Sequence, residues 1–146
     1  MPITLHHLLQ GRKLRFCAIG DGGKTYEIRK FLNGLQKSCP ADHKKMMARI
    51  VRTINEGPSK NTEHWRWIHG NDYQGMGEMK VHGRRVLCMV EDDRLLVCSH
   101  GIGKIKEKEF EKECQHARRM MDGYETAKKN QTLVEDDKEL QDANDC

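Results

Sequence analysis

The amino-acid sequence predicts an α+β fold, built as one domain over residues 1–130 and followed by an acidic tail over residues 131–146. Three segments repeat apolar residues at three- and four-residue steps, which is the period of an amphipathic helix. Between the second and third of these segments, short apolar runs are separated by turns of two residues. Turns that short force consecutive strands to run antiparallel, so the runs predict a three-stranded meander.

The first half of the domain predicts a strand followed by two helices. An apolar run marks the strand at residues 14–19, and helical spacing extends over residues 24–37. A second helix is expected over residues 40–57, because Pro40 stands at the favoured first helical position and Gly57 ends the pattern.

The second half of the domain predicts the meander and a last helix. Apolar runs at residues 79–81, 86–90 and 95–98 are the expected antiparallel strands, and helical spacing returns over residues 106–128. Residues 1–13 carry little pattern, so they are expected to form an arm or a small first helix.

The charge of the chain is unevenly divided. Residues 135–146 hold six acidic side chains and one lysine, a charge of −5. Because the whole chain has a net charge of +4, the 134 residues before them carry +9. A basic body suggests a polyanionic partner, and nucleic acid is the leading candidate. Charge that serves only solubility is the alternative interpretation. The acidic tail is too polar to build a core and is expected to be disordered.

Several classes of protein are excluded by composition. No run of about 18 apolar residues exists, and the N-terminus lacks the apolar stretch of a signal peptide, so we expect a cytoplasmic protein with no membrane partner. The six cysteines form no CxxC pair, and the eight histidines show neither HxxxH nor HExxH spacing. The sequence therefore predicts neither a disulfide scaffold nor a metal site.

A glycine-rich segment offers one alternative function. Residues 18–25, AIGDGGKT, match a relaxed phosphate-binding loop between a strand and a helix. In such a loop Lys24 would neutralise phosphate charge and Thr25 would hold magnesium, with residues 89–92 as the acidic companion strand. The tight turns between the later strands argue against a nucleotidase of this kind, which needs parallel strands joined by helical crossovers.

Basic and histidine side chains gather around the predicted meander. RNA cleavage without a metal needs a group that takes the proton from the 2′-hydroxyl, cations that stabilise the charged phosphorane, and a group that protonates the leaving 5′-oxygen. Histidine suits either proton transfer near pH 7, and lysine and arginine supply the cations. A solvated sheet face is the alternative interpretation. The candidate residues are Lys80, His82, Arg84, Arg85, His100 and Lys104.

Two tryptophans precede the meander. Trp65 and Trp67 lie one residue apart in a chain with few large aromatic residues. They are interpreted either as packing residues of the core or as surfaces on which bases stack.

Four segments, in order, resemble the phage-derived HigB-like branch of the RelE/HigB toxin superfamily over roughly residues 14–125. The resemblance implies a RelE-like plan: an N-terminal strand, two helices, an antiparallel three-stranded meander and a C-terminal helix. The segments are GEMK at 77–80, GRRVL at 83–87, LVCSHGIGK at 96–104, and a closing helix with Glu109, Glu113 and Ala117.

The resemblance also implies a function and partners. Members of this superfamily are usually toxins of type II toxin–antitoxin systems, and they act as mRNA interferases that cleave messenger RNA in the ribosomal decoding site. They need no metal or cofactor, and an antitoxin neutralises them. The implied partners of this chain are therefore the ribosome, messenger RNA and a cognate antitoxin protein.

Site residues follow from the matched positions. The resemblance gives Lys80 the role of the strand cation, Arg85 that of the phosphate-stabilising arginine, and Lys104 that of the basic residue after the last strand. His82 and His100 are assigned as acid–base groups from their chemistry rather than from a motif. Further cations expected to bind RNA are Arg84, Lys106, Lys44 and Lys45.

A second hypothesis is a non-catalytic binding protein, such as a ParE-like topoisomerase inhibitor or an interaction module. It is favoured by the absence of a tyrosine where many RelE members carry one near the last helix, since Phe110 and Cys114 stand there. We also expect the acidic tail to fold back over the basic domain and to weaken its binding to RNA.

Overall fold

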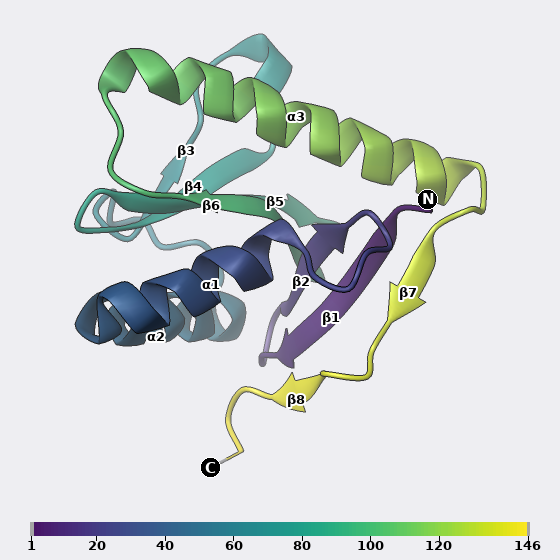
Figure 1. Cartoon of the computed structure of the whole chain (residues 1–146), viewed down its shortest axis with the longest axis horizontal. Helices are drawn as coiled ribbons and strands as arrows, with labels where there is room; N and C mark the ends of the chain where they lie inside the picture. The colour runs from purple at the N-terminus through teal and green to yellow at the C-terminus, as the bar shows by residue number, and fades with distance from the viewer. Residues whose placement is uncertain (1, 146) are drawn as a thin grey trace.

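In the computed structural model, which describes residues 2–145, one mixed β-sheet lies between two layers of helices (Figure 1). Helices α1 (Glu27–Ser38) and α2 (Pro40–Glu56) cover one face of the sheet. The longer helix α3 (Glu107–Lys129) and the short helical turn η1 (Asn71–Tyr73) cover the other face.

The sheet has eight strands in the order β3-β4-β5-β6-β2-β1-β7, with β8 also paired to β1. Strands β3 to β6 run antiparallel to one another, β2 joins β6 in parallel, and β1 is antiparallel to β2. The strands are β1 (Thr4–Gln10), β2 (Arg15–Gly20), β3 (Trp65–Trp67), β4 (Met76–Val81), β5 (Arg84–Glu91), β6 (Leu95–Ile102), β7 (Val134–Asp136) and β8 (Gln141–Asp142).

The α1–α2 layer packs through a helical stripe of apolar side chains. Ile28, Met46 and Ile50 are fully buried there. They pack against every second residue of the strands, such as Phe16, whose side chains point to this face. The contact between α1 and β6 is close: a Cβ on Gly101 would stand 2.2 Å from the ring of Phe31. Only glycine lets the helix approach the strand this closely.

The α3 layer buries the opposite face of the same strands. Ala117 and Met121 are fully buried against residues such as Val97 and Leu87, whose neighbours in sequence point to the other layer. Near the end of α3, the hydroxyl of Tyr124 donates a hydrogen bond of 2.6 Å to Glu91 of β5. The sheet therefore carries one core on each face.

The expected RelE-like plan, with one N-terminal strand and a separate three-stranded meander, is wrong, because the chain forms a mixed sheet of eight strands with three helices. The apolar runs at residues 79–81, 86–90 and 95–98 lie in β4, β5 and β6, but β3 extends this group on one side and β2 on the other. Strand β1 occupies the region expected to be an arm or a helix. Its residues are buried on both faces, so they lack the alternation that marks a half-exposed strand.

The acidic segment expected to be disordered lies against β1 instead. The backbone N–H groups of Val134 and Ala143 donate to the carbonyls of Ile3 and Gln10, at 3.0 and 2.9 Å. Side-chain contacts hold the same segment: Nδ1 of His6 lies 3.7 Å from Asp136, and Nε2 of His7 lies 3.1 Å from Glu135.

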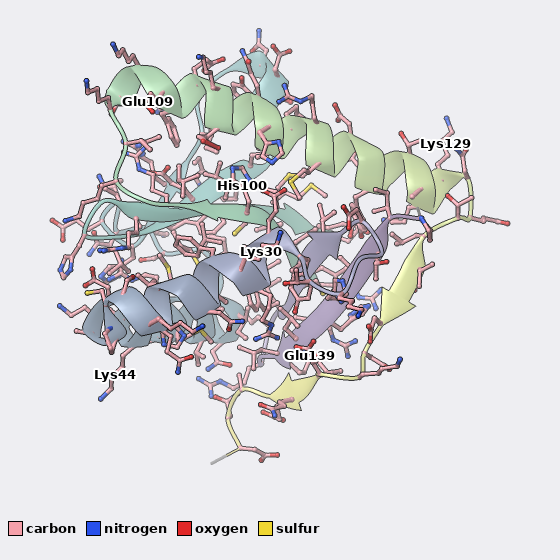
Figure 2. The ribbon with its side chains drawn as sticks, viewed as in Figure 1. Lys30, Lys44, His100, Glu109, Lys129 and Glu139 are labelled. Atoms are coloured by element: carbon pink, nitrogen blue, oxygen red, sulfur yellow. The ribbon has the colours of Figure 1, made fainter. Side chains whose placement is uncertain are left out.

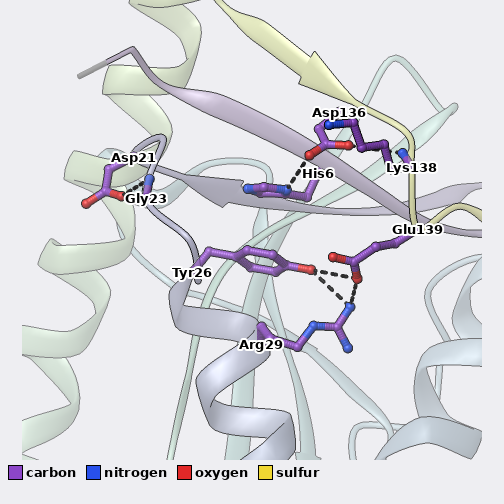
Figure 3. A network of polar contacts seen from close by, with 8 residues as sticks. All are labelled: His6, Asp21, Gly23, Tyr26, Arg29, Asp136, Lys138 and Glu139. Atoms are coloured by element: carbon purple, nitrogen blue, oxygen red, sulfur yellow. Dashed lines mark hydrogen bonds and ion pairs between the residues drawn. The ribbon is translucent and has the colours of Figure 1, made fainter.

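A polar network continues this attachment to α1 (Figure 3). Arg29 of α1 forms an ion pair with Glu139 and donates a hydrogen bond of 3.1 Å to the hydroxyl of Tyr26. The ring of Tyr26 stacks on His6 with centroids 4.0 Å apart. The acidic residues therefore meet cations and histidines of β1 and α1 rather than the basic residues of the predicted site.

The two halves of the expected nucleotide site do not meet. The loop at residues 20–25 follows the end of β2, whereas Glu91 pairs with Leu95 at the start of β6, which pairs with Arg15 at the start of β2. Residues 89–92 consequently lie at the opposite end of the sheet from the glycine-rich loop, which serves as the turn into α1.

Candidate functional site

A basic cleft of about 590 Å³ lies at the outer edge of β4, where the short strand β3 stops pairing. Strand β3 covers only Gly77–Met79, so the last residues of β4 lie beyond it. Arg49 of α2 fills part of this edge, since its Nη1 donates to the carbonyl oxygens of Lys80 at 2.6 Å and Glu63 at 3.0 Å. The charged and histidine residues that line the cleft are Lys45, Arg49, Arg66, Lys80, His64, His82, Glu63 and Glu78.

His82 stands at the mouth of this cleft on the turn between β4 and β5. His82 and Gly83 both have positive φ angles, 49° and 85°, which is the geometry of a tight two-residue hairpin turn. The turn projects the side chain of His82, which is 56% exposed, toward the first turn of α2. There its Nδ1 lies 2.7 Å from Oδ1 of Asp42.

Asp42 is a buried carboxylate that sequence reasoning missed. It is 6% exposed, and its second oxygen forms an ion pair with Arg84. The hydrogen bond from His82 holds the pKa of Asp42 below its ordinary value, so this side chain is a carboxylate at neutral pH. No local motif signals Asp42, because it contributes to the site only when α2 packs beside the turn.

A second histidine lines the cleft and was also missed. His64 lies in the loop before β3, and burial together with the neighbouring cations Arg49 and Arg52 lowers its pKa. Among the described residues its buried Nδ1 has no hydrogen-bond partner. The cleft thus places a neutral imidazole and a carboxylate-bound imidazole among four lysine and arginine side chains.

This arrangement can carry out proton transfer on an anionic substrate. A carboxylate at Nδ1 fixes the orientation and tautomer of an imidazole, which leaves Nε2 as the nitrogen that can act on a substrate. The lysine and arginine side chains that line the same cleft attract a phosphate and stabilise negative charge that develops on it.

Arg85 does not lie in the cleft. Its side chain extends to the α3 face of the sheet, is 7% exposed, and lies over the ring of Phe110 at 4.4 Å. It faces the buried carboxylate of Glu78 at 3.8 Å and Glu107 at 3.9 Å. A guanidinium covered in this way is not accessible to a substrate, so this placement does not fit the predicted phosphate-stabilising role.

His100 is likewise enclosed, between β6 and α3 (Figure 2). Its Nδ1 lies 3.0 Å from Oγ of Ser99 and its Nε2 lies 2.9 Å from Glu113, an order of groups that resembles a nucleophilic triad. Ser99 is fully buried, however, and cannot reach a substrate. The contacts of His100 are therefore structural, and burial lowers its pKa.

The remaining predicted cations do not line the cleft. Lys104 lies beside the β4–β5 turn, because a Cβ on Gly83 would stand 3.2 Å from its Cγ. Lys106 precedes α3, and Lys44 points outward from α2 (Figure 2). Of the predicted residues, the structure brings Lys45, Lys80 and His82 together in the cleft, and it attaches Arg84 to them through Asp42.

No family model and no curated protein matches this chain. Within residues 2–145, no helix combines the length and the apolar character needed to cross a membrane. The same residues contain no cluster of three or more histidine, cysteine, aspartate or glutamate side chains arranged to hold a metal ion.

Proposed function

We propose that this protein is an endoribonuclease whose active site is the basic cleft at the edge of β4. The observation that carries the proposal is the exposed imidazole of His82, held by the buried carboxylate of Asp42 beside a cleft lined by lysine and arginine. An oriented histidine among phosphate-binding cations supplies the base and the charge stabilisation that cleavage by the 2′-hydroxyl needs.

The proposed mechanism begins with the 2′-hydroxyl of the RNA. The Nε2 of His82 takes its proton, and Asp42 stabilises the imidazolium that forms. The resulting oxyanion attacks the adjacent phosphate. The cations of Lys45, Arg49 and Lys80 stabilise the charge that develops on the phosphorane and on the leaving 5′-oxygen. The P–O5′ bond then breaks to leave a 2′,3′-cyclic phosphate, a solvent water protonates the 5′-oxygen, and His82 returns its proton to solvent.

The resemblance to RelE/HigB toxins supports messenger RNA on the ribosome as the substrate and an antitoxin as the partner. In this proposal the protein is the toxin of a type II system, and the +9 charge of the chain before residue 135 favours its binding to the polyanionic ribosome. The expected active-site arginine is replaced by cations of the cleft, since Arg85 is buried elsewhere.

The test compares wild type with His82→Gln and with a matched control, His69→Gln, which changes an exposed histidine outside the cleft. Cleavage is measured on a labelled oligoribonucleotide and on messenger RNA in a translating extract, with 5′ ends mapped. We expect His82→Gln to lose about 10²- to 10⁴-fold in rate. The His69→Gln control should cleave like wild type. Full cleavage by His82→Gln would contradict the proposed active site.

The burial of Arg85 favours one alternative, an RNA-binding protein without catalysis. In that case the cations of the cleft would bind RNA, but neither wild type nor His82→Gln would produce new 5′ ends. Binding measured by filter retention under the same conditions distinguishes the two functions.

A further inference from the structure

Trp67 is an exposed aromatic side chain on the edge strand β3. It is 48% exposed, whereas Trp65, two residues earlier, is 2% exposed. Of the described residues, the other large hydrophobic side chain with comparable exposure is Val134, which lies at the opposite edge of the sheet. This indole is therefore a solvent-accessible aromatic surface on the same edge of the sheet as the basic cleft.

The ring of Trp67 is held in place from below. Trp65 and Trp67 share one face of the strand, and their rings meet edge to face with centroids 5.2 Å apart. Trp65 in turn packs over Gly77, where a Cβ would stand 2.2 Å from the indole. The exposed indole thus rests on a second, fixed indole rather than on a mobile loop.

Helix α2 leaves Trp67 uncovered because it crosses the sheet obliquely. It begins beside the β4–β5 turn, where Asp42 meets His82, and ends beside β2, where the carbonyl of Ile54 accepts a 2.8 Å hydrogen bond from Leu14. Strand β2 lies four positions from β3 in the sheet order, so the C-terminal end of α2 lies far from β3.

A basic stripe on α2 starts at the cleft and continues along this helix. Lys45, Arg49 and Arg52 stand at helical positions i, i+4 and i+7, which share one face. Lys45 and Arg49 line the cleft, and Arg52 is close enough to lower the pKa of His64. Arg52 is itself 54% exposed, so it remains available to a phosphate despite its ion pair with Glu56.

We propose that Trp67 is a stacking platform for an unpaired nucleobase, in a single strand whose phosphates lie along Lys45, Arg49 and Arg52. The inference rests on the proposed function for RNA binding but not for catalysis. Trp67 pairs with Gly77, five residues before His82, so the platform lies about 16 Å along the sheet edge from the cleft mouth. A few nucleotides of single strand bridge that separation.

The chemistry selects single-stranded over double-stranded RNA. The face of an indole stacks on any base whose own face is free, and bases inside a duplex already stack on one another. Trp67 would therefore select unpaired nucleotides for entry into the cleft, whatever their sequence.

The test uses the full chain and a 2′-O-methyl octanucleotide of mixed sequence, which has no 2′-hydroxyl and is not cleaved. Binding is followed by tryptophan fluorescence and, for the variants, by anisotropy of a labelled strand. We expect the octanucleotide to quench the emission of exposed Trp67 and Trp67→Ala to bind about 5- to 150-fold more weakly. Trp67→Phe should recover most of the affinity, and Val134→Ala is the matched control that should bind like wild type.

Three outcomes would overturn the inference. Equal affinity of wild type and Trp67→Ala, or equal affinity of wild type for the octanucleotide and its duplex, would show that no base stacks on Trp67. If wild type binds neither the octanucleotide nor its duplex, the stacking proposal and the proposed RNA binding are both wrong. Cleavage that persists while Trp67→Ala binds normally would remove the platform and leave the proposed active site intact. Near-ultraviolet circular dichroism of each variant checks that the fold is retained.

Discussion

The Nδ1 of His82 lies 2.7 Å from the Oδ1 of Asp42, although forty positions separate the two residues in the chain. One residue comes from the turn between β4 and β5 and the other from the first turn of α2. The pair exists because the helix begins beside that turn, and it gives the basic cleft its one exposed histidine with a fixed orientation.

Asp42→Asn should slow cleavage with little effect on RNA binding. Asparagine keeps the size of the side chain but cannot stabilise the imidazolium of His82, so kcat should fall at least about tenfold while KM stays near the wild-type value. Lys45, Arg49 and Lys80 still bind the phosphates. A purely structural role for Asp42 would instead lower the melting temperature and leave kcat of the folded fraction unchanged.

Arg85→Ala should destabilise the protein rather than remove a catalytic group. It leaves the buried carboxylate of Glu78 without one of its two cations, since Arg66 is the other at 2.9 Å. Loss of a buried partner costs about 3 kcal/mol of unfolding free energy, measured by urea titration. Arg85→Met combined with Glu78→Gln should recover much of that loss. An unchanged urea midpoint for Arg85→Ala would refute this role.

The free energy of unfolding should fall as the pH drops below about 6.5, the ordinary pKa of histidine. Burial lowers the pKa of His6 and His100 in the folded protein, although Asp136 near His6 and the hydrogen bond that His100 donates to Glu113 oppose the shift. The unfolded chain therefore binds more protons, and stability present above pH 6.5 is lost as the pH falls through the folded-state values. His100→Asn should flatten this dependence, measured as urea midpoints at three pH values. A flat wild-type profile would contradict it.

Deleting residues 131–146 should lower stability and leave RNA binding unchanged at physiological salt. Strand β7 lies five strand positions from β4, about 24 Å. The later residues reach the C-terminal end of α2, where Asn144 and Asn55 exchange hydrogen bonds, but Asp42 beside the cleft is about 20 Å further along that helix. Both separations exceed the screening length of about 8 Å. Deletion exposes the edge of β1 and unpairs His7 and Arg29, so we expect a melting temperature lower by at least about 4 °C. Asp137→Asn, which removes only charge, should melt like wild type. Tighter RNA binding by the deletion would restore the expectation that the tail shields the site.

Local patterns predicted the helices well because they report a local property. The stripe of Met46, Ile50 and Ile54, with Pro40 before it, depends only on spacing within one segment, and α2 occupies that segment. The apolar runs of β4, β5 and β6 are joined by tight turns for the same reason. The prediction of a separate meander was wrong because the residues within a strand do not indicate which distant strands pair with its edges.

The candidate site shows the same division. His82, Lys80 and Lys45 were accessible to sequence reasoning as basic residues near the meander, whereas Asp42 and His64 were not, since neither stands in a motif. Arg85 was predicted as a functional cation, but the alternation of β5 turns it toward Glu78 and Phe110 beneath α3. A charged residue in a strand has two possible faces, and the sequence does not say which one a helix will cover.

By itself, the sequence determined the three helices, the short turns, the uneven charge and the supply of histidines and cations, all of which depend on neighbours within a few residues. Tertiary structure alone decided that β1 pairs with β2, that the acidic segment binds β1, and that Asp42 meets His82. Those contacts join residues distant in the chain, and their free energy comes from burial and pairing that exist only once the sheet has formed.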